Sequence, residues 1–268
     1  MKLSEINIYP IKSLAGIRLE SARVEARGLE FDRRWMLVDD SRTFLTQREF
    51  PVMATIKVTV DGRMLTASAG WKQIEIPFSE DNGKKTTVKI WNSSVKAEVY
   101  DDAINEWFSE ALGTKCSLVA MTPSSKRIVS PFYAVRRFRD QVSFADGYPF
   151  LLIGEASLAD LNSRLPEPLP MNRFRPSFVV KGSEPFAEDK WKKIRIGKTL
   201  YHVVKQCERC VITTIDQTEG EKTGKEPLAT LSGFRNQKGK ILFGQNLIAD
   251  EPEGTISIGE AVEIVESR

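Results

Sequence analysis

Histidine and cysteine are scarce in this sequence: His202 is the only histidine, and there are three cysteines. A small and odd number of cysteines argues against a disulfide framework and is typical of a reducing compartment. The N-terminal residues lack the apolar core of a secretory signal, and no run of about 18 apolar residues, enough to span a bilayer, occurs anywhere. We therefore expect a cytoplasmic protein with no membrane partner.

A strong charge of one sign is absent as well. The formal net charge is +3 in a chain of 268 residues, and the basic residues are spread along it. This balance gives no reason to expect a nucleic-acid partner. With 41% hydrophobic and 28% charged residues, the chain can form a core of ordinary size, which argues against a mainly disordered protein. Its length allows two modest domains or one large domain.

Strand patterns dominate the first hundred residues, where apolar and polar residues alternate over short segments. These segments are 34–39, 54–68, 72–78, 87–91 and 95–100, with turns expected at Asp61-Gly62 and at 92–94. The period becomes helical at 101–113, with Asp101 or Asp102 as the predicted N-cap and Gly113 as the predicted end. We expect this helix to cover the first sheet.

The second half of the chain begins with a polar stretch at 121–131 that contains two prolines. This stretch is the best candidate for a domain boundary or a long functional loop. An amphipathic helix is predicted at 155–165, followed by strand patterns at 178–182, 193–204, 210–216, 240–250 and 255–266. Glycines among these strands are typical of barrel corners. We predict a β-dominated α+β fold: an N-terminal β-barrel-like domain over 1–122 and a second β-barrel domain with few helices over 123–268.

Two of the three cysteines, Cys207 and Cys210, lie three positions apart in the stretch C-E-R-C. A zinc site needs about four ligands, and only Cys116 and His202 remain as soft donors, at no finger-like spacing. A redox pair normally opens a helix, whereas the β-branched residues after Cys210 predict a strand. Two other interpretations stay open: both thiols are buried apolar side chains, or one thiolate binds a metal whose other ligands come from a cofactor.

Several basic residues stand where they are suited to hold an anion. Arg209 lies beside Cys210 and can favour the thiolate over the thiol. Arginine binds phosphate and carboxylate groups through two donors at once, and lysine and serine add further donors. If 173–175 is a strand, Arg173 and Arg175 point the same way and form one clamp. The other candidates are Lys12, Ser13, Arg33, Arg34 and the cluster at 134–140, which is either a substrate rim or a hydrated loop. Taken singly, each is better explained as a solvated strand end or a surface ion pair.

Together these stretches resemble the MOSC family, and most closely its members with an added N-terminal β-barrel domain, which include amidoxime-reducing proteins. The order and spacing of the matching stretches hold over nearly the whole chain. They are IYPIKSLAG, GLEFDRRWMLVD, EASLADLNSRL, NRFRPS, GKTLYHVVKQCERCVITTID, KEPLATL, LFGQN and GTISIGEAV.

The resemblance implies a molybdenum cofactor, in which Cys210 ligates the metal and a molybdopterin supplies the other sulfurs. It also implies that basic and small polar residues hold the pterin and its phosphate. The residues implied are Lys12, Ser13, Arg33, Asp146, Asn172, Arg173, Arg175, Arg209, Gln245 and Asn246. Two positions depart from the family pattern. Ser177 replaces a usual asparagine, which is expected to alter hydrogen bonds around the site. Arg34 stands where an aromatic residue can occur, which is expected to change the charge of the pocket and so the substrate.

The activity implied by the resemblance is the removal of oxygen from N-hydroxylated compounds such as amidoximes, hydroxamic acids or hydroxylamino-purines. No four-cysteine set follows Cys210, so we expect no iron–sulfur cluster in this chain. Electrons would then come from a separate donor of the ferredoxin or flavoprotein type. Two alternatives are a non-catalytic carrier, holding the cofactor or a persulfide on Cys210, and a protein that has kept the fold but lost the cofactor.

Overall fold

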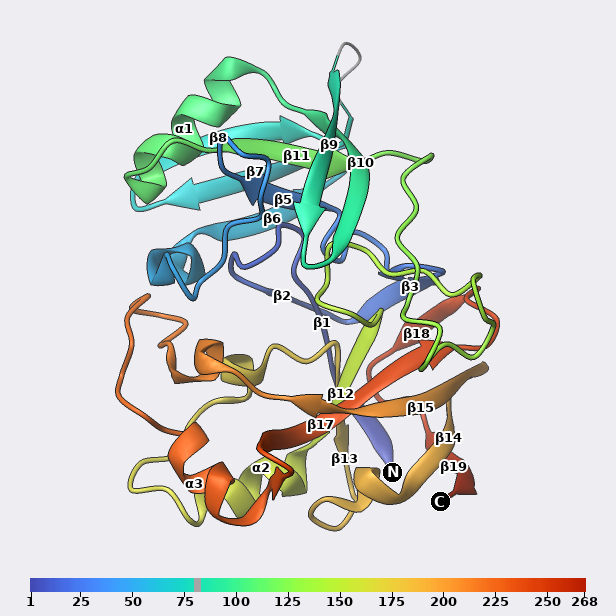
Figure 1. Ribbon diagram of the computed structural model, residues 1–268. Helices are drawn as coiled ribbons and strands as arrows, with labels where there is room; N and C mark the ends of the chain where they lie inside the picture. The colour runs from blue at the N-terminus through green and yellow to red at the C-terminus, as the bar shows by residue number, and fades with distance from the viewer. Residues whose placement is uncertain (80–82) are drawn as a thin grey trace.

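The computed structural model describes residues 1–79 and 83–268 and is built mainly of strands, with few and short helices (Figure 1). The predicted β-dominated α+β class is therefore confirmed. The helical segments are α1 (Asp102–Leu112), α2 (Glu155–Asn162), α3 (Leu228–Phe234) and the 3-10 turns η1 (Pro51–Thr55), η2 (Met171–Phe174), η3 (Ala187–Lys190) and η4 (Val211–Thr214). Within the described residues, no helix combines the length and apolar character needed to cross a membrane.

The largest sheet has nine strands, which follow the order β19-β14-β15-β17-β12-β13-β1-β2, with β16 paired to β17 beside this path. Strands β12 and β13 are parallel, and α2 forms the crossover between them, because parallel neighbours need such a connection. The strands are β1 (Lys2–Ile8), β2 (Ile17–Leu19), β12 (Phe150–Gly154), β13 (Phe178–Lys181), β14 (Trp191–Ile196), β15 (Thr199–Glu208), β16 (Asn236–Gln237), β17 (Lys240–Ala249) and β19 (Val262–Ser267).

Three smaller sheets complete the described part of the chain. One holds β5 (Trp35–Val38), β11 (Ser117–Met121), β10 (Ser93–Val99) and β9 (Lys84–Ile90). A second holds β6 (Lys57–Asp61), β7 (Met64–Ala69) and β8 (Lys72–Pro77), and a third holds β18 (Thr255–Ser257), β3 (Ser21–Glu25) and β4 (Gly28–Leu29). Each sheet ends in edge strands, so the sheets described here do not close into barrels, and the expected barrel geometry is corrected.

The first strands of the chain are hydrogen-bonded to strands from its second half. Ile6 of β1 lies opposite Phe178 of β13, and Ala22 of β3 lies opposite Ile256 of β18. The N-terminus therefore lies beside the large sheet, away from the sheet of β5, β11, β10 and β9 and the sheet of β6, β7 and β8 (Figure 1). This pairing brings the turn after β1 to the region between the two halves of the molecule. The domain boundary at residues 122 and 123 stays a prediction.

Helix α1 begins and ends as the sequence predicts. The Asp101 carboxylate accepts a hydrogen bond from the backbone N–H of Ile104, and Gly113 ends the helix in the left-handed conformation at φ 65°. Its apolar face buries Phe108 against the small sheets, in the same core as Trp35. The helix therefore covers the first sheets, as expected.

Aromatic packing fixes the strands that carry the site. The rings of Phe150 on β12, Phe178 on β13 and Tyr201 on β15 lie in mutual contact, with centroids 5.3–5.5 Å apart. All three side chains are buried, and aromatic pairs of this kind add about 1 kcal/mol each beyond the area they bury. This cluster holds β12 and β15 in place, and the residues that precede β12 and those that end β15 reach one cleft.

Candidate functional site

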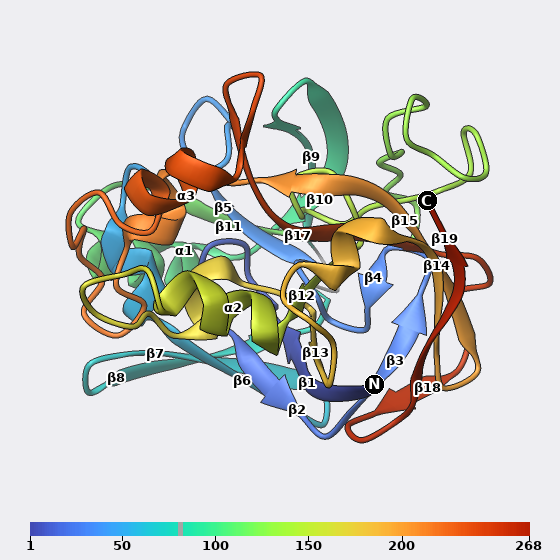
Figure 2. The ribbon, with the colours of Figure 1, turned by 90° about the horizontal axis from the view of Figure 1, so that it is seen from below.

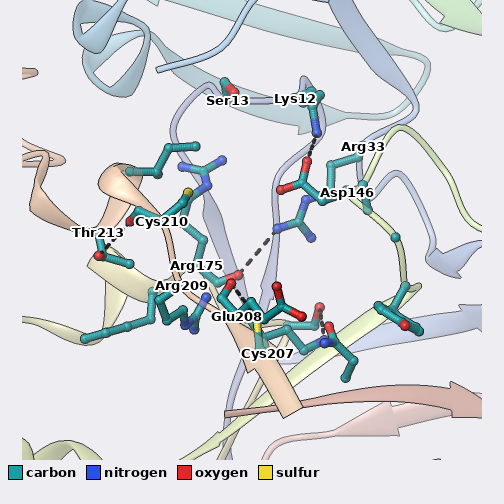
Figure 3. A pocket seen from close by; sticks show the side chains of 18 of the residues that line it. Lys12, Ser13, Arg33, Asp146, Arg175, Cys207, Glu208, Arg209, Cys210 and Thr213 are labelled. Carbon is teal, nitrogen blue, oxygen red and sulfur yellow. Dashed lines mark hydrogen bonds and ion pairs between the residues drawn. The ribbon is translucent and has the colours of Figure 1, made fainter. Parts of the chain in front are cut away.

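A cleft opens between the turn after β1, the segment before β12 and the end of β15 (Figure 3). Its basic side chains outnumber its acidic ones. The basic residues are Lys12, Arg33, Arg48, Arg173, Arg175 and Arg209, and the acidic residues are Asp146 and Glu208. Such an excess of cations in a concave site attracts anionic ligands. Both Cys207 and Cys210 also line it.

The structure brings most of the predicted site residues together in this cleft. Those that line it are Lys12, Ser13, Arg33, Asp146, Arg173, Arg175, Arg209, Cys210 and Asn246. Two predicted residues lie outside it. Asn172 is exposed, and its carbonyl accepts the backbone N–H of Arg175. Gln245 is fully buried, and its amide donates to the Asp189 carboxylate at 2.7 Å. These two residues are therefore adjacent to the cleft rather than part of its wall.

The turn after β1 places an ammonium group at the cleft wall. Lys12 is buried, and its Nζ lies 2.6 Å from the Asp146 carboxylate, which is more than half exposed. The backbone N–H of Lys12 donates to the carbonyl of Trp35, which fixes the turn against β5. Burial lowers the pKa of Lys12 to about 8, against the opposing effect of Asp146. The ammonium is therefore charged at neutral pH but close to losing its proton.

Two guanidinium groups pack on one tyrosine ring in the cleft wall. The Arg33 and Arg175 guanidinium carbons lie 4.3 and 4.1 Å from the centroid of the Tyr9 ring. Arg33 also pairs with the buried Asp32 at 2.6 Å, and Arg175 donates to the carbonyl of Leu14 at 2.7 Å. Burial lowers the pKa of Arg175 to about 10, so its guanidinium stays charged at neutral pH, and burial raises the pKa of Tyr9 to about 12, so its hydroxyl stays neutral. The two cations are thus held side by side on one aromatic ring.

Three residues that line the cleft have strained backbone conformations. Ser13, Arg33 and Arg175 all adopt left-handed backbone angles, with φ of 69°, 50° and 53°. A non-glycine residue rarely adopts this conformation, which costs about 1–3 kcal/mol, and such residues cluster at functional sites. Three residues with strained backbone conformations therefore line the same cleft.

The cysteine pair does not open a strand, and the prediction of a strand at 210–216 is wrong. Strand β15 ends at Glu208, opposite Leu242 of β17, and Cys210 is followed by the 3-10 turn η4. The hydroxyl and N–H of Thr213 both donate to the Cys210 carbonyl. Threonine can bond to nearby backbone in this way in competition with a strand, and β-propensity depends on having a partner strand. The turn leaves Cys210 partly exposed at the cleft wall, and all three cysteines are free thiols.

Arg209, between the two cysteines, carries an unused donor. Its Nε donates to the carbonyl of Phe243 at 2.9 Å, and its guanidinium lies 5.3 Å from the ring centroid of Phe174. Its Nη2 atom is buried and has no hydrogen-bond partner among the described residues. A buried donor without a partner is costly, so this atom is poised to donate to a ligand that is negatively charged or rich in acceptors.

Arg173 and Arg175 do not form a strand clamp, which corrects the prediction made from their spacing. Residues 171–174 form the 3-10 turn η2, so the two side chains have separate partners. Arg173 pairs with Asp216 at 2.8 Å, whereas Arg175 donates to Gln217 and to the Leu14 carbonyl. Arg173 is thus largely occupied by a protein carboxylate, and Arg175 is the better candidate for contact with an anion.

The two departures from the family pattern lie in different environments. Ser177 lines the cleft, and its hydroxyl accepts from the backbone N–H of Leu151. Arg34 is not among the lining residues. It pairs with Glu25 at 2.6 Å and donates to the carbonyl of Leu29. The expectation that Arg34 changes the charge of the pocket is therefore wrong, because its guanidinium is used elsewhere.

Two arginines important for the cleft were not identified from the sequence. Buried Arg127 donates to the carbonyls of Ser143, Ala145 and Asp146, which fixes the loop that carries the Asp146 carboxylate. Arg48 lines the cleft and lies 3.7 Å from the same carboxylate. The only signal for Arg127 was its position in the polar stretch at 121–131, and no pattern in the sequence pointed to Arg48.

We expect the affinity of the cleft for a small anion to fall as the pH rises through about 8, because Lys12 loses its proton there. Loss of one charged contact weakens binding by roughly fivefold. In K12R the guanidinium keeps its charge throughout, so the decline should disappear. Calorimetric titration of cofactor-free protein with sulfate, between about pH 6.5 and 9.5, measures this. A decline of equal size in K12R would contradict the assignment.

The fold and the cleft together define a β-rich protein suited to hold an anionic group beside a cysteine thiol. Comparison with known families gives the particular class. Residues 1–115 match the MOSC N-terminal beta barrel domain, and residues 139–263 match the MOSC domain. The chain belongs to the MOSC family, and the resemblance stated from the sequence is confirmed.

Curated relatives extend this result over nearly the whole chain. It is 36% identical over 263 residues to the molybdenum cofactor sulfurase of Oryza sativa subsp. japonica, covering 90% of this chain but 32% of that protein. It is 32% identical over 276 residues to mitochondrial amidoxime-reducing component 1 of Homo sapiens, covering 97% of this chain and 82% of that protein. The corresponding protein of Mus musculus is 33% identical over 276 residues, with 97% and 81% covered. The chain thus spans about a third of the sulfurase and most of the amidoxime-reducing component.

Proposed function

We propose that this protein binds the molybdenum cofactor and reduces N-hydroxylated compounds, using electrons from a separate redox protein. The observation that carries the proposal is the placement of the Cys210 thiol in a cleft rich in cationic side chains. A soft thiolate suits a molybdenum centre, and the basic residues suit the anionic pterin phosphate. Relatives named as amidoxime-reducing components, similar over 97% of this chain, favour this class of substrate.

The residues of the cleft fit such a cofactor. Cys210 would ligate the metal, while Arg175, Arg33 and the unpartnered Nη2 of Arg209 would bind the anionic part. When bound, the cofactor supplies two-electron oxygen-atom-transfer chemistry, while the protein binds and orients it. The strained backbone at Arg33 and Arg175 holds their side chains ready before binding, which reduces the entropy lost in forming the complex.

Cleavage of one N–O bond to an amine and water consumes two electrons and two protons. Asp146 is an unsuitable proton source, because Lys12 pairs with it and holds it as a carboxylate. Lys12 is the better donor. The pKa of its ammonium is lowered by burial to about 8, and a general acid works best when its pKa is close to the working pH. We propose that Lys12 delivers a proton in the cleft and regains it from water.

The test is the metal content and turnover of protein purified from cells that make molybdopterin. We expect close to one molybdenum per chain, and conversion of benzamidoxime to benzamidine with reduced methyl viologen as the electron source. Protein without molybdenum would refute the proposal. The sulfurase relatives favour a second candidate, a carrier of the cofactor or of a persulfide on Cys210. Molybdenum at full occupancy without any turnover would support that carrier instead. The cytoplasmic location stays a prediction.

A further inference from the structure

An exposed loop beside the cleft is rich in aromatic and basic residues and lacks acidic ones. We call residues 126–139, KRIVSPFYAVRRFR, the aromatic–basic loop. Phe132 is 92% exposed and Phe138 is 66% exposed, which is unusual for phenylalanine, a residue normally inside proteins. The loop projects from the body of the molecule on the side of β15 (Figure 2). Exposed aromatic groups gathered in this way mark interaction surfaces.

The loop is held in a defined shape by a buried carboxylate. Asp140 accepts from the backbone N–H groups of Val135 and Arg136 at 2.7 Å, and from Arg136 Nε at 2.9 Å. At its base, the N–H of Val129 donates to the Asp140 carbonyl. The aromatic side chains are therefore presented to solvent by an ordered backbone, and a preorganised surface loses less entropy when a partner binds.

The outward charge of the loop is positive. Its nearest acid, Asp140, is buried and paired with Arg136, so it does not neutralise the surface. Lys126, Arg137 and Arg139 are exposed, and none of them forms an ion pair within the described residues. Arg137 lies over the ring of Phe138, at 5.3 Å from its centroid. Aromatic and arginine side chains are the residues most enriched at binding interfaces.

The loop is connected directly to the mouth of the cleft. The ring of Tyr133 lies 6.0 Å from the ring of Tyr148, which lines the cleft. The Nζ of Lys205 lies over the Tyr133 ring, 5.1 Å from its centroid, and pairs with the cleft residue Glu208 at 2.7 Å. A molecule seated on the loop would therefore lie next to the cleft that holds Cys207 and Cys210.

We propose that the aromatic–basic loop is the docking surface for a small electron-transfer protein with an acidic face around its redox group. The inference rests on the proposed function, in which electrons come from a separate redox protein that must reach the mouth of the cleft. Two encounters would each deliver one electron. Weak redox encounters bury little area and depend on charge complementarity for their rate, which fits a short basic loop with two exposed rings.

Binding of an acidic [2Fe–2S] ferredoxin, measured by calorimetry at low and high salt, tests the docking surface without any turnover. We expect R137E/R139E and F132A/F138A each to weaken binding by roughly tenfold or more. Matched controls lie far along the chain: W71A removes another exposed ring, and K84E/K85E makes the same change of charge on β9. Both controls should bind as the wild type does, and wild-type binding should weaken with salt.

Turnover with reduced methyl viologen separates this inference from the proposed function. The small reductant needs no docking surface, so both loop variants should keep wild-type turnover with it and lose turnover with ferredoxin. Absence of turnover in the wild type with viologen refutes the proposed function. The binding measurement still tests whether the loop is a docking surface. The inference is overturned if the wild type and the loop variants bind ferredoxin equally well, or if none of these proteins binds it. Loop-dependent binding to phosphatidylglycerol vesicles in place of ferredoxin also overturns it, because the loop would then be a membrane contact.

Discussion

Replacing Cys210 by alanine is expected to lower the molybdenum content of the purified protein by roughly tenfold or more, and to abolish turnover. The thiolate is the only bond that the protein would make to the metal, so nothing in the chain replaces it. Cys210 lies at the cleft wall directly after Arg209, at the start of the turn η4. Metal content by mass spectrometry and turnover with reduced methyl viologen measure the effect.

Cys207→Ala is the matched control, because it removes the same group three positions away in the same cleft. Burial raises the pKa of the Cys207 thiol, and its sulfur donates weakly to the neighbouring Glu208 carbonyl at 3.7 Å. A thiol held in its protonated form is a poor metal ligand. We expect C207A to keep most of its molybdenum. Equal losses from both substitutions would argue against a site built on one thiolate.

Replacing Arg175 by glutamine is expected to lower cofactor affinity by roughly ten- to a hundredfold, the effect of losing a charged, two-donor contact of about 1.5–3 kcal/mol. Arg175 keeps its charge at neutral pH although burial lowers its pKa to about 10. A guanidinium crowded by Arg33 on the face of Tyr9 gains most when an anion binds, because the anion offsets the repulsion between the two cations. Molybdenum per chain in R175Q measures the loss.

Arg164 provides the comparison for R175Q. Its guanidinium is about half exposed and pairs with Asp160 one helical turn away. Surface pairs of this type contribute at most about 1 kcal/mol. R164Q should therefore keep wild-type cofactor occupancy. If R175Q and R164Q both unfold in urea at nearly the wild-type midpoint, neither substitution acts through general instability. If R175Q and R164Q retain the same molybdenum, Arg175 is not a cofactor contact.

Local signals in the sequence predicted elements whose cause is local. Helix α1 follows from its apolar period, a carboxylate at Asp101 and a glycine at Gly113, all within a few residues of one another. The hairpin with its turn at Asp61-Gly62 follows in the same way, because β6 and β7 pair directly across it. The turn expected at 92–94 is displaced toward Trp91, since Ser93 already pairs with Ile90. Such errors are small because neighbouring residues determine these structures.

Elements that depend on distant partners were predicted less well. The run after Cys210 has the composition of a strand, but the pairing of β15 with β17 ends at Glu208, opposite Leu242, before Cys210 is reached. Arg173 and Arg175 have the spacing expected of a clamp, yet Arg173 forms an ion pair with Asp216, which lies 43 residues away in the sequence. Arg127 gave no signal beyond its position in the polar stretch at 121–131, because its partners are backbone carbonyls of a loop.

By itself, the sequence determined the β-rich class, the family and the identity of most charged side chains in the cleft, because composition, period and motif order are properties of the chain. The tertiary structure alone decided which of these groups meet. It placed Lys12 against Asp146, and Arg33 and Arg175 on one tyrosine ring, and it directed Arg34 away to Glu25. The physical reason is that charge pairing and burial depend on distances between segments, which no local pattern encodes.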